Sequence, residues 1–106
     1  PNLLPRDRPA LLHGNLSGSH VLYDRAGPIL IDPAPSYGLR ESELAWVQLM
    51  GRFDESFFDA YTEAFPLEPG FAERRPLYQL YPLLVLLLTE GNAYRGAVEA
   101  LLGKYA

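Results

Sequence analysis

The stretch LLHGNLSGSHVLYDRAGPILID, residues 11–32, decides the fold of this chain. It contains two short apolar runs, HVLYD and PILID, which are separated by Arg-Ala-Gly and include β-branched residues. Such runs on either side of a short break are typical of a β-hairpin. We therefore predict strands at about residues 20–24 and 28–32. A loop starting at His13 precedes them, and Asp32 is the last residue of the second predicted strand.

The flanking sequence alternates helical patterns with breaks rich in proline and glycine. PAPSYG, residues 33–38, predicts irregular structure, and the prolines among the first ten residues predict an extended lead-in. Apolar periodicity, start signals and stop signals predict four helices, at about residues 41–50, 54–65, 76–89 and 93–105.

The third predicted helix contains two prolines and the longest apolar tract. Pro76 fits its first turn, where the missing N–H costs nothing, and Pro82 should kink it at a cost of about 3 kcal/mol. The tract at residues 77–88 has twelve residues, whereas a bilayer span needs about 20. We therefore expect a buried core helix and no membrane partner.

Two groups of side chains in the earlier helices are assigned structural roles. The aromatic residues that share one stripe of the second predicted helix are expected to pack in the core; they are Phe57, Phe58, Tyr61 and Phe65. Charged residues at the start of the first predicted helix are expected to form a solvated helix start, where acidic groups interact favourably with the helix dipole. These residues are Arg40, Glu41 and Glu43.

The composition favours one small globular domain over residues 1–106, with 48% hydrophobic and 21% charged residues. The absence of cysteine excludes a disulfide framework and a thiolate metal site, and it fits a reducing, cytoplasmic location. We expect no secretory signal, because the first residues lack a basic region followed by an apolar run. The net charge is −4 and the basic residues are scattered, so we expect no nucleic-acid partner.

The loop before the hairpin and the aspartate at its end suggest a phosphotransferase site. Kinase-like folds direct a carboxylate and metal ions at one nucleotide from such positions. Considered alone, His13 would be a hydrogen-bonded structural histidine and Asn15 a turn residue. Asp32 alone would be either a strand-end carboxylate that caps a turn or a metal ligand.

The run LLHGNLSGSHVLYDRAGPILIDPAPSYGLRESELA resembles the fructosamine kinase (ketosamine-3-kinase) family, whose corresponding run reads approximately LLHGDLWSGNVL…IDPA..YGHRE.DLA. SFFDAY, EAFPLEPGFAERRPLYQLY and AYRG extend the resemblance over nearly the whole chain. It implies a mostly helical α+β fold: the C-terminal lobe of a protein-kinase-like fold, with a catalytic-type loop, one β-hairpin and about four helices. Aminoglycoside phosphotransferases are related. The family uses ATP and Mg²⁺ to phosphorylate the 3-hydroxyl of ketosamines, which are sugars attached to amines.

The resemblance also implies roles for four residues. His13 would brace the catalytic loop, and Asn15 occupies the place of the catalytic aspartate. His20 stands where the family has a metal-binding asparagine, and Asp32 matches the aspartate that holds magnesium. No substrate-binding residue is assigned.

Several positions depart from the family pattern. Asn15 cannot accept a proton, so a base contribution of about 10²- to 10⁴-fold would be lost. His20 offers a nitrogen where Mg²⁺ prefers oxygen, which favours a metal such as Zn²⁺. Ser17 replaces a tryptophan, and Leu86 and Leu88 continue an apolar run where the family commonly has histidine and asparagine.

The sequence also shows no equivalent of the ATP-binding lobe. It has no Gly-rich phosphate loop, and its one lysine is Lys104. We therefore predict a ketosamine-kinase-like phosphotransferase fragment that binds ATP poorly and is weak or inactive alone, with a missing N-terminal lobe as its natural partner. The alternative is a non-catalytic binding or self-associating structural module derived from a kinase lobe.

Overall fold

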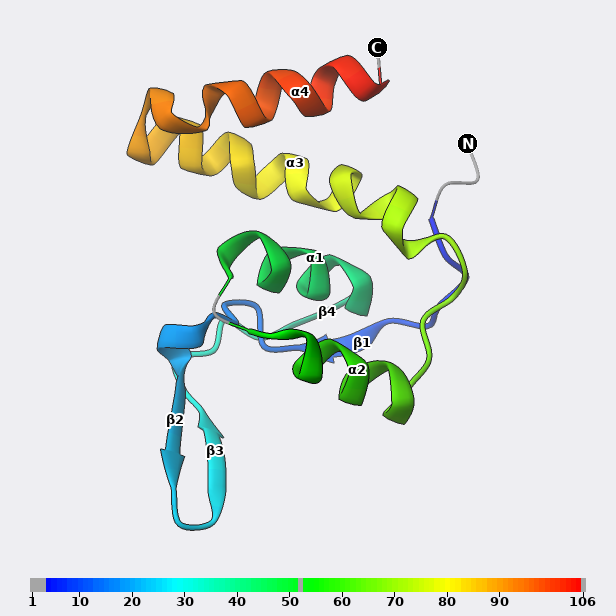
Figure 1. Cartoon of the computed structure of the whole chain (residues 1–106), viewed down its shortest axis with the longest axis vertical. Coiled ribbons are helices and arrows are strands. Elements are labelled where there is room, and N and C mark those ends of the chain that lie inside the picture. Colours follow the sequence, from blue (N-terminus) through cyan, green and yellow to red (C-terminus); the bar gives the residue numbers. More distant parts are fainter. Residues whose placement is uncertain (1–3, 52, 106) are drawn as a thin grey trace.

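The computed structural model describes residues 4–51 and 53–105, which form two small sheets and four α-helices (Figure 1). The strands are β1 (Ala10–Leu12), β2 (Val21–Asp24), β3 (Gly27–Leu30) and β4 (Ser36–Gly38). The α-helices are α1 (Arg40–Met50), α2 (Glu55–Ala64), α3 (Phe71–Glu90) and α4 (Arg95–Tyr105). Short 3₁₀ turns, η1 (Gly18–His20) and η2 (Asn92–Tyr94), precede β2 and α4. The predicted mostly helical α+β fold is confirmed.

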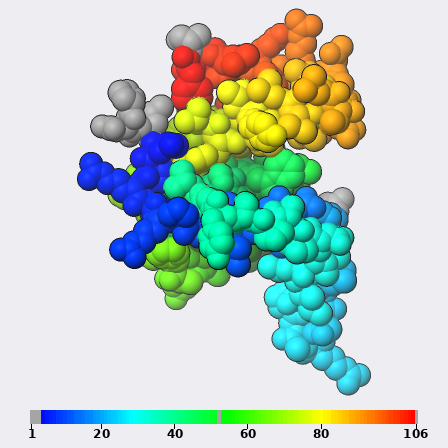
Figure 2. Space-filling model, turned by 180° about the vertical axis from the view of Figure 1, so that it is seen from behind, coloured from blue at the N-terminus to red at the C-terminus, as the bar shows by residue number. Residues whose placement is uncertain are grey.

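The predicted hairpin is confirmed as the antiparallel pair β2–β3, in which Val21 lies opposite Leu30. The Asp24 carboxylate accepts hydrogen bonds from the backbone N–H groups of Ala26 and Gly27, at 2.7 and 3.2 Å, and these bonds close the turn. β3 ends at Leu30 and not at Asp32, whose φ of 51° interrupts the extended backbone. The hairpin projects from the body of the molecule when seen from either side (Figures 1 and 2).

The prediction of irregular structure at residues 33–38 is wrong for its second half. Ser36–Gly38 forms β4 and pairs with β1, so the expected lead-in also gives way to a strand at Ala10. Pro33 and Pro35 precede β4 and therefore remove no donor from its ladder. This pairing closes the base of the segment that contains the loop and the hairpin. Residues 1–3 of the predicted lead-in lie outside the described part of the chain.

The helix α3 packs against both α1 and α4 (Figure 1). The buried apolar side chains come from these three helices. They are Leu44, Ala45, Val47, Leu83 and Val98. Burial of a leucine or valine contributes about 1.5–3 kcal/mol each, so this small core contributes substantially to stability.

The helix α3 begins five residues before its predicted start at Pro76. Gly70, with a φ of 97°, precedes its first residue, Phe71. Pro76 therefore lies in the helix interior and cannot donate a hydrogen bond to the preceding turn. The added turn carries Arg74, which binds Glu41 of α1, and this tertiary contact favours the earlier start.

Two predictions of core packing hold only in part, since α3 contributes Leu83 to the core and Phe57, Phe58 and Tyr61 are half-buried. In the apolar tract of α3 only Leu83 is buried, while Tyr81 is 76% and Leu88 is 87% exposed. No residue of α2 is buried either, and Phe65, at the end of its aromatic stripe, is 57% exposed. A chain of this size cannot enclose every apolar face of its helices. Within the described residues, no helix is long and apolar enough to cross a membrane.

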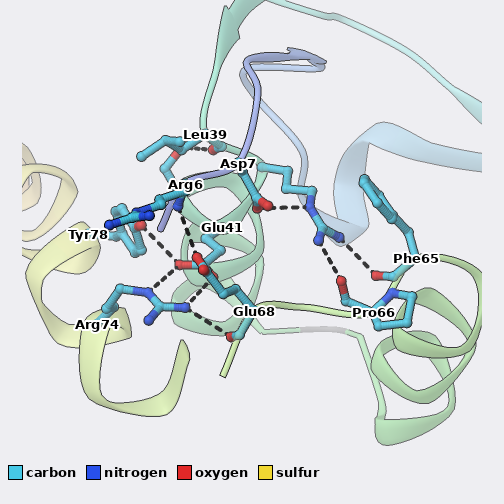
Figure 3. Close-up of polar contacts among 11 residues, drawn as sticks. Arg6, Asp7, Leu39, Glu41, Phe65, Pro66, Glu68, Arg74 and Tyr78 are labelled. Carbon is cyan, nitrogen blue, oxygen red and sulfur yellow. Dashed lines mark hydrogen bonds and ion pairs between the residues drawn. The ribbon is translucent and has the colours of Figure 1, made fainter. Parts of the chain in front are cut away.

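The first turn of α1 is buried, which corrects the prediction of a solvated helix start. Glu41 has no exposed surface, and it accepts hydrogen bonds from Arg74 Nε at 2.8 Å, Arg74 Nη2 at 2.7 Å and the Tyr78 hydroxyl at 2.9 Å (Figure 3). Two donors from Arg74 match the geometry of a carboxylate, and the pair links α1 to α3. Burial of a charge is favourable only with such partners.

Arg40 is also buried, and it ties α1 to two other segments. Its guanidinium donates to the carbonyls of Phe65 and Pro66, at 2.8 and 2.6 Å, and to the Asp7 carboxylate at 3.2 Å (Figure 3). The guanidinium carbon also lies 3.6 Å from the centre of the Phe65 ring, which is a cation–π arrangement. The start of α1 thereby fixes both the segment before β1 and the connection from α2 to α3.

The contacts between α1 and α3 change the pKa values of Glu41 and Tyr78. Burial acts to raise the pKa of Glu41, but hydrogen bonds from Arg74 and Tyr78 outweigh it, and the pKa lies below its ordinary value of 4.5. Burial raises the pKa of the Tyr78 hydroxyl, and its hydrogen bond to the Glu41 carboxylate raises it further. Glu41 therefore stays ionised and Tyr78 stays neutral at physiological pH.

Candidate functional site

His13 links the loop before the hairpin to the residues that follow β3. Its Nδ1 accepts a hydrogen bond from the backbone N–H of Asn15 at 3.1 Å, and its Nε2 lies 2.9 Å from the carbonyl oxygen of Ile31. A backbone N–H can only donate, so the ring carries its proton on Nε2 and donates it to Ile31. The His13 carbonyl accepts from the Ala34 N–H at 2.8 Å. Two side-chain bonds and one backbone bond thus hold the loop against the residues after β3.

Gly14 permits the closest approach in the loop. Its φ is 83°, and a Cβ added there would lie 1.8 Å from the carbonyl oxygen of Ala34. Only glycine fits this conformation and this contact. The turn brings Asn15 round to the residues that follow β3.

Glu43 supports the loop from α1, a role that the sequence analysis missed. Its Oε2 accepts from the backbone N–H of His13 at 3.1 Å, and its Oε1 accepts from that of Gly14 at 2.8 Å. The prediction that Glu43 belongs to a solvated helix start is therefore wrong. No local pattern marks it, because its partners lie 29 and 30 residues earlier in the chain.

The structure brings Asn15 next to Asp32. The Asn15 side-chain amide donates to the Asp32 carbonyl oxygen at 3.3 Å, and its backbone carbonyl lies 2.7 Å from Nδ1 of His20. With the bond from the Asn15 N–H to His13, all four predicted site residues are therefore connected through Asn15. As a neutral amide, Asn15 can orient a hydroxyl group but cannot take its proton.

His20 and Asp32 are the two predicted metal ligands. The carbonyl of Asn15 can only accept, so His20 donates from Nδ1 and keeps its lone pair on Nε2, the usual arrangement of a metal-binding histidine. Asp32 is exposed, and Ile31 beside it donates its N–H to the His20 carbonyl at 2.9 Å. Over residues 4–51 and 53–105, no three His, Cys, Asp or Glu side chains gather closely enough to hold a metal ion. One carboxylate and one imidazole are a poor fit for Mg²⁺, which prefers oxygen ligands.

A cavity of about 510 Å³ adjoins the loop and lies among β1, α1 and α3. Its lining includes Asn15 and Glu43 together with three aromatic residues, Trp46, Tyr78 and Tyr81. Its volume is typical of small-molecule sites, which measure about 300–1,000 Å³. The indole nitrogen of Trp46 is buried and has no hydrogen-bond partner among the described residues.

A family profile and the sequences of known proteins both relate this chain to fructosamine and ketoamine kinases. The family profile described as fructosamine kinase matches residues 5–106. The chain is 47% identical over 98 residues to the probable ketoamine kinase of Enterococcus faecium and 47% identical over 89 residues to the ketosamine-3-kinase of Mus musculus, covering 92% and 84% of this chain.

Two solved structures share its fold. A protein from Thermobifida fusca assigned as a fructosamine-3-kinase superposes with a TM-score of 0.80 at 40% identity and covers 92% of the chain. One from Haemophilus somnus with the same assignment gives 0.79 at 31% identity over 91% of the chain. The chain spans about a third of these proteins: 35% of the E. faecium sequence, 29% of the mouse sequence and 34% of each solved chain.

Proposed function

The chain belongs to the fructosamine kinase family, and from that premise we propose that it supplies the catalytic-loop side of an ATP-dependent phosphotransferase that acts on ketosamines. In this proposal residues 1–106 are one partial lobe of the kinase-like fold, and the nucleotide-binding lobe is a separate part. The lobe alone is weak or inactive, because position 15 carries an amide and not a carboxylate.

The observation that carries the proposal is the way in which Asn15 is held. The loop is fixed by His13 and by Glu43, and it places Asn15 both beside Asp32 and in the wall of a cavity of ligand size. A phosphotransferase needs an acceptor hydroxyl to be oriented at this kind of position. The arrangement can orient such a group even where it cannot deprotonate it.

The chain's own residues would contribute to the reaction by positioning. Asn15 would hydrogen-bond the acceptor hydroxyl, and the proton of that hydroxyl would pass to solvent because the amide cannot accept it. His13 keeps its proton on Nε2, bonded to Ile31, and so serves as a brace and not as a base. ATP, when bound, supplies the phosphoryl group. Since Asp32 and His20 together fit Mg²⁺ poorly, no step is assigned to that ion.

The test is calorimetric titration of the chain with ATP in the presence of Mg²⁺, Mn²⁺ or Zn²⁺, together with a phosphorylation assay on a ketosamine. The matched variant carries Asn15→Asp and His20→Asn, which restore the family's residues. We expect weak or no binding for the chain as it stands, and metal-dependent nucleotide binding for the double variant. Phosphorylation far above background by the unmodified chain would overturn the proposed inactivity. A double variant that binds no nucleotide even when it is joined to the nucleotide-binding lobe of a ketoamine kinase relative would overturn the phosphotransferase assignment.

A second candidate function, a self-associating module, is favoured by the apolar surface of the hairpin. Leu22, Tyr23 and Leu30 are each more than half exposed. A hollow of about 680 Å³ next to the hairpin is lined by further apolar residues, among them Phe53 and Phe57. Apolar patches of this kind promote association. Sedimentation velocity distinguishes the candidates: a monomer at all concentrations excludes self-association, and a dimer weakened by Leu30→Ser supports it.

A further inference from the structure

The cavity beside the catalytic-type loop combines a carboxylate with several aromatic rings. Among the described residues, Glu43 is the charged member of its lining, and Trp46, Tyr78 and Tyr81 are the aromatic ones. No lysine or arginine of the described part of the chain lines it. A site without basic residues disfavours phosphate groups and other anions, and a carboxylate at its wall favours a cation.

The Glu43 carboxylate is oriented and still has capacity for a ligand. Each of its oxygens accepts one backbone N–H, from Gly14 at 2.8 Å and from His13 at 3.1 Å. A carboxylate oxygen has two acceptor positions, so one remains on each oxygen. The two backbone donors fix the direction of this charge, and a cation in the cavity meets it without further ordering of the side chain.

Tyr78 and Tyr81 bring ring surface to the cavity. The Tyr78 hydroxyl is occupied, because it donates to Glu41 at 2.9 Å. Tyr81 is 76% exposed, so its ring contributes little to the packing of the core. The faces of such rings attract organic cations, and a cluster of rings next to a carboxylate is a typical site for an alkylammonium group.

We propose that this cavity binds the protonated amine of the acceptor, with Glu43 opposing its charge and Trp46, Tyr78 and Tyr81 providing the ring surface. The inference rests on the proposed function and adds to it the recognition element: the amine is read here, and the attached sugar extends to Asn15. A ketosamine carries both groups, whereas a free sugar carries only one.

The sequence contains a single tryptophan, Trp46, so intrinsic fluorescence reports directly on this cavity. The chain is titrated with fructosyl-butylamine, with fructose, which lacks the amine, and with butylamine, which lacks the sugar. We expect a saturable change with both amines and at least about tenfold weaker binding of fructose. Added salt should weaken the binding of the amines and not that of fructose, because it screens the charge.

Variants of Tyr81 test the ring surface without disturbing the core. Tyr81→Leu should weaken fructosyl-butylamine binding about three- to tenfold, and Tyr81→Phe should leave it unchanged. Tyr23→Leu is the matched control, since Tyr23 is 77% exposed and lies on the hairpin, outside the lining of this cavity. Equal affinity for fructose and fructosyl-butylamine, no saturable response to the amines, or an unchanged Tyr81→Leu variant would each overturn the inference.

The nucleotide titrations separate this inference from the proposed function. If amines bind at Trp46 but the double variant with Asn15→Asp and His20→Asn, joined to a relative's nucleotide-binding lobe, binds no nucleotide, the cavity assignment is retained and the phosphotransferase assignment is removed. If that variant binds nucleotide but amines give no fluorescence response, the phosphotransferase assignment is retained and the cavity assignment is removed.

Discussion

Glu41 is the residue on which the packing of α1 against α3 depends most directly. Glu41→Gln should destabilise the chain by about 3 kcal/mol, because it leaves the guanidinium of Arg74 without its carboxylate in a buried place. Glu99→Gln is the control, since Glu99 and its partner Arg95 are 61% and 67% exposed and such a pair contributes about 0.5 kcal/mol or less. Urea unfolding followed by circular dichroism measures both. Equal losses would show that burial of Glu41 contributes no stability.

Gly14 provides a second prediction at the level of a single residue. Gly14→Ala should cost at least about 2 kcal/mol, because it adds a clash with the Ala34 carbonyl to the strain of a positive φ. Gly51→Ala isolates the strain alone, since Gly51 has a φ of 72° and no atom within 4 Å of an added Cβ. The loss for Gly14→Ala should clearly exceed that for Gly51→Ala in thermal unfolding. The reverse order would contradict the tight loop described for residues 13–15.

Among the helices, α4 offers a site for stabilisation. Gly103 lies inside this helix, and a Cβ added there meets no atom within 4 Å. Gly103→Ala should therefore raise the unfolding free energy by about 0.5–1 kcal/mol through the backbone entropy of the unfolded chain. Gly91→Ala, at a φ of 88° after α3, should lower it. A loss at Gly103 would mean that α4 does not keep its helical conformation in solution.

Elements with local signals were predictable from the sequence, and those that depend on distant partners were not. The β2–β3 hairpin and α1 follow from short patterns, and their observed limits differ from the predictions by at most two residues. The pairing of β1 with β4 joins segments about 26 residues apart, and each strand has only three residues. Such short strands carry no periodic pattern that could indicate them.

The positions of the candidate site residues in the loop and hairpin were predictable from the sequence, whereas the supporting residue on α1 was not. The resemblance to a family located His13, Asn15, His20 and Asp32 in the sequence, and the structure connects all four of them by hydrogen bonds to Asn15. Glu43 was missed because an acidic residue in the first turn of a helix has a simpler explanation in the helix dipole. The roles of His20 and Asp32 toward a metal stay predictions.

For the whole molecule, the lowered pKa of Glu41 makes stability depend on pH. Because the folded-state pKa lies below 4.5, the contribution of Glu41 is fully present above about pH 4.5 and is lost as the pH falls through the folded-state pKa. The difference in unfolding free energy between the unmodified chain and Glu41→Gln should thus shrink in acid. Urea unfolding at a series of pH values from about 7 to about 3 measures it. A constant difference would exclude linkage through Glu41.

The first turn of α1 also constrains the order in which the chain can fold while it is being made. Synthesis proceeds from the N-terminus, so Arg40 and Glu41 emerge from the ribosome after Asp7 but before the partners that lie later in the chain. Arg40 waits for the carbonyls of Phe65 and Pro66, and Glu41 waits for Arg74 and Tyr78. The loop held by Glu43 can close early, but a nascent chain that ends before residue 78 carries an incompletely satisfied charge at the centre of its future core. The catalytic-type loop is thus synthesised before Phe65, Pro66, Arg74 and Tyr78, the residues that complete its surroundings.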